Sequence, residues 1–392
     1  MSLLNVVSNG LNFYAGCRLF EEKFGYYFSS KIHFIFRNVL QNTANSMRIA
    51  ESVEKCDILL DSVWETINIG HWRDVDVFWR QVYRSVCFIK SVNLFCLENF
   101  VDALKACDMG LIMGAPVHDE MFVQYLADVI QSKLVICTTV KPKNTEQPNK
   151  SELKPPWLPN PKIIPEFDSP SLEHFIQLVA GGTPFIMKNT IMHWPASQKW
   201  CPDYLLEHFG CRTVPIEIGS SYTSDKWSQK LVTLREFIET YMLNSSNEVA
   251  YLAQYELFNH ITKLKDDIIP LDYCAVSGDS VVTNCWFGPE GTVSPLHHDQ
   301  YQNLFCQVYG YKRFTLFERT ADMHPHSHHL LENTSQIDIE SPLVLDEFPD
   351  YADMTAWFAD LCPGDVLYIP MSWWHHVRSI SPSFSVSFWW KK

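Results

Sequence analysis

NCWFGPEGTVSPLHHDQYQNLFCQVYGYKRF (284–314) and CPGDVLYIPMSWWHHVRSISPSFSVSFWW (362–390) are the two stretches that decide the fold of this chain. The segment 304–317 contains two apolar runs around a Tyr-Gly turn, and a Pro-Gly-Asp turn introduces the apolar run 366–369. The segment 383–390 alternates small polar with large apolar residues, which is the period of a β-strand. Several short strands separated by turn signals predict a sandwich or barrel with helices packed outside it.

The same two stretches contain a possible metal site. His297 and Asp299 are two residues apart, so their side chains lie on one face of an extended strand and can share a metal ion. His298 points the other way, although the sequence alone also allows His298 as the ligand. The third ligand is expected from the segment WWHHVR, at His375. Two histidines and one carboxylate leave coordination positions open, as in non-heme iron(II) enzymes, whereas a structural zinc site is closed.

The first third of the chain has a helical pattern. Between about residues 31 and 137, apolar residues recur every three or four positions, as they do from Val75 to Val86, and this spacing predicts amphipathic helices. The segment 103–114 (ALKACDMGLIMG) is predicted to be another helix. No clean internal repeat is evident, which favours an all-helical bundle for docking or stability over a helical-repeat array.

Prolines mark the boundary between this region and the strand-rich part. The segment VKPKNTEQPNKSELKPPWLPNPKIIP contains too many of them for a helix or a central strand, so it is expected to be a semi-extended linker. We therefore expect a helical domain at 31–140, a Pro-rich linker at 141–162 and a catalytic domain at 163–392. Beyond the linker, Ser171 is expected to cap a helix at 172–179, and the apolar run 185–187 follows.

Composition excludes several classes of function. The chain has 392 residues, of which 46% are apolar, and a net charge of −14, which argues against direct nucleic-acid binding and favours a basic peptide partner. None of its 12 cysteines forms a C-x-x-C pair, so we expect buried thiols in a reducing, intracellular compartment. No secretory leader or membrane-spanning run is evident, and a soluble protein is expected.

The two quoted stretches resemble the JmjC family of oxygenases, and within it the type to which arginyl hydroxylation is assigned. The resemblance extends to the segments HWPASQKW, CRTVPIEIGSSYTSDKWSQKL and YLAQYELF, and so covers roughly 163–392, with a weaker echo in GHWRDVDVFWRQVY and KACDMGLIMG. It implies an α+β protein in which an all-helical N-terminal region precedes a double-stranded β-helix, or cupin-like jelly roll, with flanking helices. It also implies iron(II) held by His297, Asp299 and His375, with molecular oxygen as a reactant.

The resemblance further implies a site for 2-oxoglutarate as cosubstrate. Lys312 would pair with its distal carboxylate, assisted by Tyr251, Ser294 and Asn303. An ammonium together with hydroxyl and amide donors suits a dianion in a partly buried site, where an unpaired charge is costly. Each of these residues taken alone also fits an ordinary structural role.

For the substrate, the resemblance points to Glu217, Tyr222, Trp227 and Trp286. A carboxylate flanked by aromatic rings suits a guanidinium, which donates forked hydrogen bonds and stacks on rings. A methylated lysine would require an aromatic cage around its ammonium. Core packing is an equally good interpretation for Trp286, and Glu217 is the more discriminating position.

Two positions depart from the family pattern. His376, next to the distal ligand, stands where the family more often has an aromatic residue such as tyrosine. His298 replaces a neutral amide within the metal motif. Both add titratable groups near the metal, so an altered pH dependence or a false ligand is conceivable, but neither removes a required group.

The resulting hypothesis is an iron(II)- and 2-oxoglutarate-dependent protein hydroxylase that acts on arginine side chains and releases succinate and carbon dioxide. Its partner would be an arginine-containing protein or peptide, such as a histone, ribosomal or chromatin-associated protein, without direct contact to nucleic acid or membrane. The resemblance places it in the nucleus, with the cytoplasm as a second compartment. The alternatives are a histone methyl-lysine demethylase, a histone-tail peptidase and a non-catalytic chromatin adaptor.

Overall fold

The computed structural model of this chain describes residues 8–9, 49–118, 120–135, 147–150, 154–219, 222–223, 227–244, 248–278, 280–328 and 331–391. The expected start of the helical region at 31–48, its end at 136–140 and much of the expected linker (141–146 and 151–153) lie outside the described residues. In the part of the chain that is described, no helix is both long enough and apolar enough to cross a membrane.

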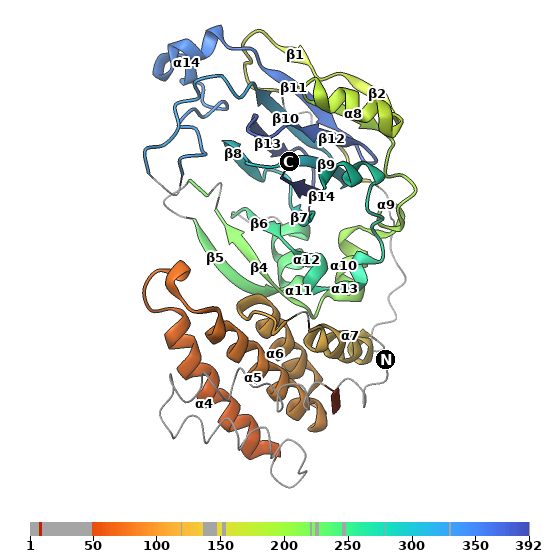
Figure 1. Cartoon of the computed structure of the whole chain (residues 1–392), viewed down its shortest axis with the longest axis vertical. Coiled ribbons are helices and arrows are strands. Elements are labelled where there is room, and N and C mark those ends of the chain that lie inside the picture. The colour runs from red at the N-terminus through yellow and green to blue at the C-terminus, as the bar shows by residue number, and fades with distance from the viewer. Residues whose placement is uncertain are drawn as a thin grey trace.

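Among the described residues of the N-terminal part, the main elements are four helices (Figure 1). They are α4 (Ile49–Ile67), α5 (Val77–Cys96), α6 (Phe100–Met113) and α7 (Phe122–Val135). Short polar side chains begin two of them: Asp76 accepts a hydrogen bond from the Phe78 N–H, and Asn99 accepts one from the Asp102 N–H. Each helix packs on the next one along the chain, and together they enclose one apolar core that belongs to the helical part. This agrees with the predicted helical periodicity.

The remainder of the chain is a β-sandwich with helices around it, so the predicted α+β class is confirmed (Figure 1). One sheet has five strands in the order β1 (Lys162–Ile163), β11 (Trp357–Leu361), β10 (Lys312–Phe317), β13 (Trp374–Ser379) and β8 (Val293–His298). The other sheet has nine strands, in the order β2 (Glu166–Asp168), β3 (Phe185–Lys188), β12 (Val366–Ile369), β9 (Gln302–Tyr309), β14 (Ser383–Trp390), β7 (Val282–Gly288), β6 (Ala250–Tyr255), β4 (Thr213–Ile218) and β5 (Ser228–Thr233).

Short helices and turns complete the described structure. They are α8 (Leu172–Ala180), α9 (Pro195–Lys199), α10 (Pro202–Phe209), α11 (Leu234–Phe237), the π-helical turn Ile238–Leu243, α12 (Leu257–His260), α13 (Thr262–Lys265) and α14 (Val344–Glu347), with 3-10 turns at Trp72–Asp74, Asp272–Ser277 and Pro349–Asp353. Of these, α14 packs against the smaller sheet. The predicted cap is confirmed, because the Ser171 side chain accepts a hydrogen bond from the His174 N–H at the start of α8.

Strands β9 and β10 pass from one sheet to the other. The turn between them contains Gly310 with φ +73, where a side chain would meet the Pro382 carbonyl oxygen. The two strands predicted around the Tyr-Gly turn are confirmed, but they pair with different neighbours instead of with each other. Phe305 of β9 and Phe314 of β10 therefore meet edge to face across the sandwich, 4.9 Å apart.

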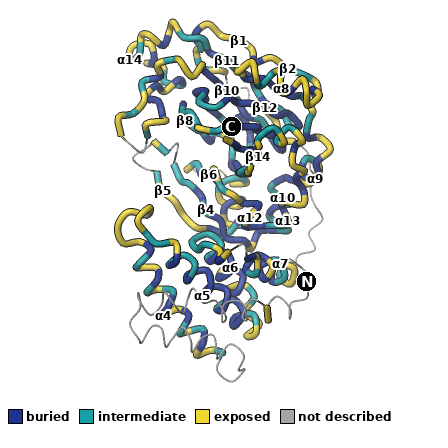
Figure 2. The backbone as a smooth tube through the Cα atoms, in the orientation of Figure 1, coloured by how far each residue is buried: buried dark blue, intermediate teal, exposed yellow. Residues whose placement is uncertain are grey.

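The core between the two sheets lies directly beside the candidate site. It contains Phe305, Phe314, Leu316 and Leu367, all at most 4% exposed, together with Trp286. Figure 2 shows that the strands of the sandwich are mostly buried, while the exposed residues gather in the connections. Side chains that point inward from the strand ends are therefore held by packing on several sides.

The helical part and the sandwich share a buried polar junction. Arg212, just before β4, donates from Nε to Asp108 of α6 (2.8 Å) and from Nη1 to Gln131 of α7 (3.0 Å). The second carboxylate oxygen of Asp108 accepts the Thr213 N–H at 2.7 Å, and its first lies 2.8 Å from His260 Nε2. Arg212 and Asp108 are both fully buried, so each charge depends on partners supplied by the other part of the molecule.

Candidate functional site

Two strands and one turn bring together His297, Asp299 and His375. In the pairing of β8 with β13, His375 lies directly opposite His297, and Asp299 follows immediately after the end of β8. The carboxylate oxygen Oδ2 of Asp299 lies 3.8 Å from His297 Nε2 and 3.6 Å from His375 Nε2. One ligand atom from each of the three residues lies within 4.8 Å of the other two, which is the spacing of a shared metal site.

Backbone carbonyls fix the orientation of both histidine rings. His297 Nδ1 lies 2.7 Å from the Pro295 oxygen, and His375 Nδ1 lies 3.0 Å from the Trp373 oxygen. A carbonyl only accepts, so Nδ1 must hold the proton and Nε2 keeps its lone pair. Burial, reinforced by the neighbouring His297, lowers the pKa of His375 to about 4, which keeps that ring neutral. The donor set therefore fits a divalent metal ion.

The two neighbouring histidines point away from this cluster. The ring of His298 packs edge to face on Trp374, 4.6 Å away. His376 is buried, and its Nε2 lies 3.9 Å from a carboxylate oxygen of Glu340. Neither belongs to the group of three possible ligands in the described structure, so alternation along the strands distinguishes His297 from His298 and His375 from His376.

A narrow inner cavity adjoins the three residues, with about 20 Å³ of free space. Lys312 of β10 is fully buried in its wall and donates to the Tyr251 hydroxyl at 2.7 Å. No carboxylate forms an ion pair with Lys312 among the described residues, and burial lowers the pKa of its ammonium to about 7. Ser294 and Asn303 line the same cavity, so all four residues predicted for 2-oxoglutarate lie together.

The inner cavity fits an anion, because its walls carry polar atoms without partners. Asn303 Oδ1 and Trp389 Nε1 are buried, line the cavity region with their side chains, and lack hydrogen bonds. Rotation of the Asn303 amide exchanges its oxygen for a donor. These donors and the Lys312 ammonium would satisfy a carboxylate, provided that the cavity walls move apart to admit it.

A wider outer pocket of about 270 Å³ also adjoins the possible metal ligands His297 and Asp299. Glu217 of β4 and Tyr222 line it together with His297 and Asp299. Burial raises the pKa of Glu217, whose carboxylate accepts a hydrogen bond from Trp227 Nε1 at 3.2 Å. Trp227 thus contacts the carboxylate without lining the pocket itself.

Trp286 has a mixed position. It lines both the inner cavity and the outer pocket. It is also almost buried, with 9% of its surface exposed, and its Nε1 donates a hydrogen bond to Ser387 on the neighbouring strand β14 at 2.9 Å. Its ring packs near those of Tyr251 and Phe305. The structure therefore gives it a packing role in the sandwich and a place in the site wall at once.

Sequence reasoning missed the segment that closes the outer pocket. Leu331, Asn333 and Thr334 lie on the connection between β10 and α14 and line the pocket. Thr334 forms a β-bridge with His297, and its hydroxyl lies 3.2 Å from the Tyr222 hydroxyl. This connection has no strand alternation or motif in its sequence, so only the three-dimensional pairing reveals its role.

A buried lysine and a possible metal-binding triad at the end of a cupin-type sandwich are the features that a metal-dependent oxygenase requires. Comparison with known proteins agrees. Residues 171–392 match the family described as "Cupin-like domain", and residues 31–139 match "KDM8-like, N-terminal ARM repeats". The helical part is thus related to a repeat family, and the expectation of a bundle without repeats is wrong.

Relatives match over most of the chain. "Lysine-specific demethylase 8" of Danio rerio is 42% identical, over 86% of this chain and 87% of its own length. "Jumonji C domain-containing protein 5" of Drosophila melanogaster is 39% identical, over 85% of each chain. The human "Bifunctional peptidase and (3S)-lysyl hydroxylase JMJD7" is 25% identical, over 58% of this chain and 84% of its own. The chain belongs to the JmjC family of iron(II)- and 2-oxoglutarate-dependent dioxygenases.

Proposed function

We propose that this chain hydroxylates arginine side chains of protein substrates. The observation that supports the proposal is the half-buried carboxylate of Glu217, which lines the outer pocket beside two of the possible metal ligands. A guanidinium that enters the pocket would neutralise this carboxylate and bring its own methylene carbons toward the metal position. The cited relatives are named as a lysine-specific demethylase and as a lysyl hydroxylase, and both names refer to lysine. The choice of arginine as the target residue therefore belongs to this proposal and not to those names.

His297, Asp299 and His375 are the proposed iron(II) ligands. Their two neutral Nε2 atoms and one carboxylate would occupy one side of the metal and leave the other side for the cosubstrate and oxygen. When bound, iron(II) supplies oxygen activation coupled to the oxidative decarboxylation of 2-oxoglutarate. One oxygen atom enters a C–H bond of the substrate, and the other is recovered in succinate together with carbon dioxide.

Lys312 is the proposed partner of the distal carboxylate of 2-oxoglutarate, with Tyr251, Ser294, Asn303 and the iron position around the rest of the molecule. A fully buried ammonium without an anion is unfavourable, and a bound carboxylate removes that cost. The surrounding apolar side chains, among them Phe305 and Phe314, exclude water from the reacting atoms.

Tyr222, Trp227 and Trp286 complete the proposed substrate pocket. Trp227 orients the Glu217 carboxylate through its indole N–H, and the Tyr222 ring lies edge on to the His297 ring, with centroids 6.4 Å apart. We also propose the division into a helical domain (31–140), a linker (141–162) and a catalytic domain (163–392), and residence in the nucleus with the cytoplasm as a second compartment.

The test is direct. The chain is incubated with iron(II), 2-oxoglutarate, oxygen and a library of arginine-containing peptides drawn from histone and ribosomal proteins, and the products are sequenced by mass spectrometry. Addition of one oxygen to arginine supports the proposal. Succinate formation in the presence of peptides, with no hydroxylated arginine in any of them, contradicts it.

A second candidate is demethylation of methyl-lysine, which the names of several relatives favour. Hydroxylation of the methyl group by the same site would release formaldehyde and leave lysine. Formaldehyde from methyl-lysine peptides distinguishes this activity from arginyl hydroxylation. The name of one relative also includes a peptidase, and cleaved peptides in the same mass spectra would reveal that reaction.

A further inference from the structure

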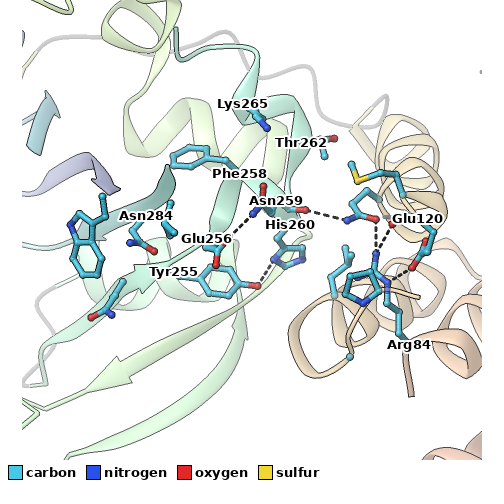
Figure 3. A pocket seen from close by; sticks show the side chains of 18 of the residues that line it. Arg84, Glu120, Tyr255, Glu256, Phe258, Asn259, His260, Thr262, Lys265 and Asn284 are labelled. Atoms are coloured by element: carbon cyan, nitrogen blue, oxygen red, sulfur yellow. Dashed lines mark hydrogen bonds and ion pairs between the residues drawn. The ribbon is translucent and has the colours of Figure 1, made fainter. Parts of the chain in front are cut away.

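A large groove lies where the helical part meets the sandwich (Figure 3). It has about 880 Å³ of free space, far more than the outer pocket of the active site. Helices α5 to α7 and their connections supply one wall, with Arg84, Glu120, Met121 and Gln124. The sandwich supplies the other wall through the end of β6, helices α12 and α13, and the strands β7 and β14.

The groove reaches the active site at two points. Gln254 lines both the groove and the outer pocket that contains Glu217. Trp389 lines both the groove and the inner cavity that contains Lys312. Its ring stacks on Tyr301, with centroids 5.2 Å apart, and this pair forms a wall between the groove and the metal site. A chain that enters the outer pocket can therefore continue into the groove past Gln254.

The backbone is unusual at this junction. Gln254 has φ +46, a left-handed conformation that non-glycine residues rarely adopt. The pairing of β6 with β7 is irregular between Leu252 and Tyr255, around this residue. Strained residues that persist in a structure are commonly functional, and this one lies where the two spaces meet.

Both walls of the groove are held in place by hydrogen bonds. The Gln124 side chain of α7 donates to the Asn259 carbonyl oxygen, linking the two walls at 3.4 Å. Tyr255 and His260 lie side by side, with the Tyr255 hydroxyl 3.0 Å from His260 Nδ1 (Figure 3). His260 Nε2 in turn lies 2.8 Å from Asp108 of α6. A preformed groove of this kind loses little entropy when it binds a ligand.

The chemistry of the walls suits a polypeptide backbone. The walls contain both amide side chains (Gln124, Gln254, Asn259 and Asn284) and aromatic ones (Tyr255, Phe258, Tyr301 and Trp389). The charged side chains of the walls balance in sign. Arg84 pairs with Glu120 and also donates to Gln124, while Glu256, which accepts from the neutral amide of Asn259, and Lys265 add one charge of each sign. Amides bind the peptide groups of an extended chain and aromatic rings bind its side chains, whereas a highly charged ligand finds no excess of opposite charge here.

We propose that this groove binds the stretch of substrate polypeptide that flanks the hydroxylated residue, so that the helical part forms half of the substrate-binding surface. The proposal rests on the proposed function, because it takes the outer pocket as the place where the target side chain enters. The volume of the groove and its position next to that pocket, with Gln254 lining both, favour a polypeptide over a small metabolite.

The test compares two peptides on the full chain. The first is an arginine peptide hydroxylated in the assay described above, cut to two residues on each side of the target. The second keeps ten further residues on each flank. Each added flank spans roughly 33–36 Å when extended. We expect kcat/KM for the long peptide to exceed kcat/KM for the short peptide at least tenfold. Substitution of Met121→Arg, in the helical wall, should abolish that advantage and leave the short peptide unaffected.

The matched control is Val101→Arg, which places the same charge at an exposed site of α6 outside the groove. It should retain the full advantage of the long peptide. An independent readout replaces Met121 by the photoreactive residue benzoylphenylalanine, which should crosslink to the long peptide in the flank and not to the short one. Equal kcat/KM for all peptide lengths, with no crosslink, overturns the groove proposal while hydroxylation persists. Absence of any hydroxylated arginine overturns the proposed function instead.

Discussion

Glu217 is the residue on which the proposed choice of substrate depends. Its carboxylate lies in a pocket with aromatic neighbours and accepts a single hydrogen bond from the described residues, that of Trp227, which leaves it further capacity to accept hydrogen bonds. A guanidinium would use that capacity through two parallel hydrogen bonds, which a primary ammonium cannot form. The residue therefore separates arginine from lysine by geometry as well as by charge.

Replacement of Glu217 by glutamine keeps the shape of the side chain and removes its charge. We expect KM for the arginine peptide to rise about 10- to 100-fold, the loss of a charged hydrogen bond of roughly 1.5–3 kcal/mol. Oxidation of 2-oxoglutarate without peptide should be unchanged. The control Glu239→Gln, at an exposed ion pair with Arg235, should not alter KM. Unaltered KM in the Glu217 variant would show that this carboxylate does not bind the substrate.

The raised pKa of Glu217 also predicts a pH dependence. Burial favours the neutral acid, so this carboxyl takes up its proton at a higher pH than an ordinary glutamate. KM for the peptide should therefore rise as the pH falls through that raised pKa, because only the ionised form attracts a guanidinium. The Glu217→Gln variant should show no such rise. Steady-state kinetics across the acid range, with enzyme stability checked at each pH, measure the difference.

Lys312 predicts proton uptake when the cosubstrate binds. Burial lowers its pKa to about 7, so at pH 8 most of the free protein holds a neutral amine. A bound carboxylate favours the charged form, and binding should take up a proton above pH 7 and weaken as the pH rises. Calorimetry of 2-oxoglutarate binding in two buffers of different ionisation enthalpy detects the proton. Lys312→Arg stays charged and should bind without proton uptake; identical proton uptake in both proteins contradicts the assignment.

At the scale of single residues, the sequence indicated most of the site residues but not the segment that closes the outer pocket. Strand alternation selected His297 over His298, and the structure shows these two side chains on opposite sides of β8. Resemblance to the family indicated Lys312 and Glu217. No local sequence pattern shows that these two side chains point into the site. Thr334 was missed because it lies in an irregular connection, and its contact with Tyr222 joins residues 112 positions apart.

Among the elements, the turn between β9 and β10 is the most sensitive to change. Gly310→Ala would place a methyl carbon 1.9 Å from the Pro382 carbonyl oxygen in a left-handed conformation. We expect a loss of at least about 2 kcal/mol in the free energy of unfolding, measured in urea. The control Gly278→Ala has a similar φ of +64 and open space around it, so it should cost only about 1 kcal/mol. Equal losses would show that the close approach of Pro382 is unimportant.

The elements were largely predictable, since local chemistry determines them. A helix cap at Ser171, period-two alternation in 383–390 and the turn before 366–369 all correspond to observed boundaries. Their partners were not predictable. The sequence places β9 and β10 next to each other, whereas hydrogen bonding places them in opposite sheets, because that choice depends on strands from distant parts of the chain.

At the scale of the whole molecule, Arg212 and Asp108 join the helical part to the sandwich. Burial alone would raise the pKa of Asp108, but Arg212 and His260 hold it below its usual range. Asp108→Asn and Arg212→Met should each reduce the free energy of unfolding by about 3–5 kcal/mol, because each leaves a buried charge without its partner. The double variant should lose less than the sum. Additive losses in urea unfolding would mean that the two charges do not stabilise each other.

No feature of the sequence indicated this junction. Asp108 lies within a helical pattern and Arg212 precedes a strand, and each alone resembles a solvated charge. The repeat character of the helical part was also missed, since divergent repeats leave no obvious period in one sequence. The placement of whole domains depends on a few buried contacts, and single-sequence patterns carry little information about them.

The buried pair has a consequence for how the chain is made. Asp108 leaves the ribosome 104 residues before Arg212, an interval of roughly 5 to 20 seconds at ordinary rates of synthesis. During that interval the nascent helices carry a carboxylate in a position that will later be dry, with no cation to neutralise it. They cannot bury that face with its charge paired until Arg212 and the strand that follows it, β4, emerge. A nascent chain stalled before residue 212 should therefore bind chaperones, and release from them should follow the synthesis of His260.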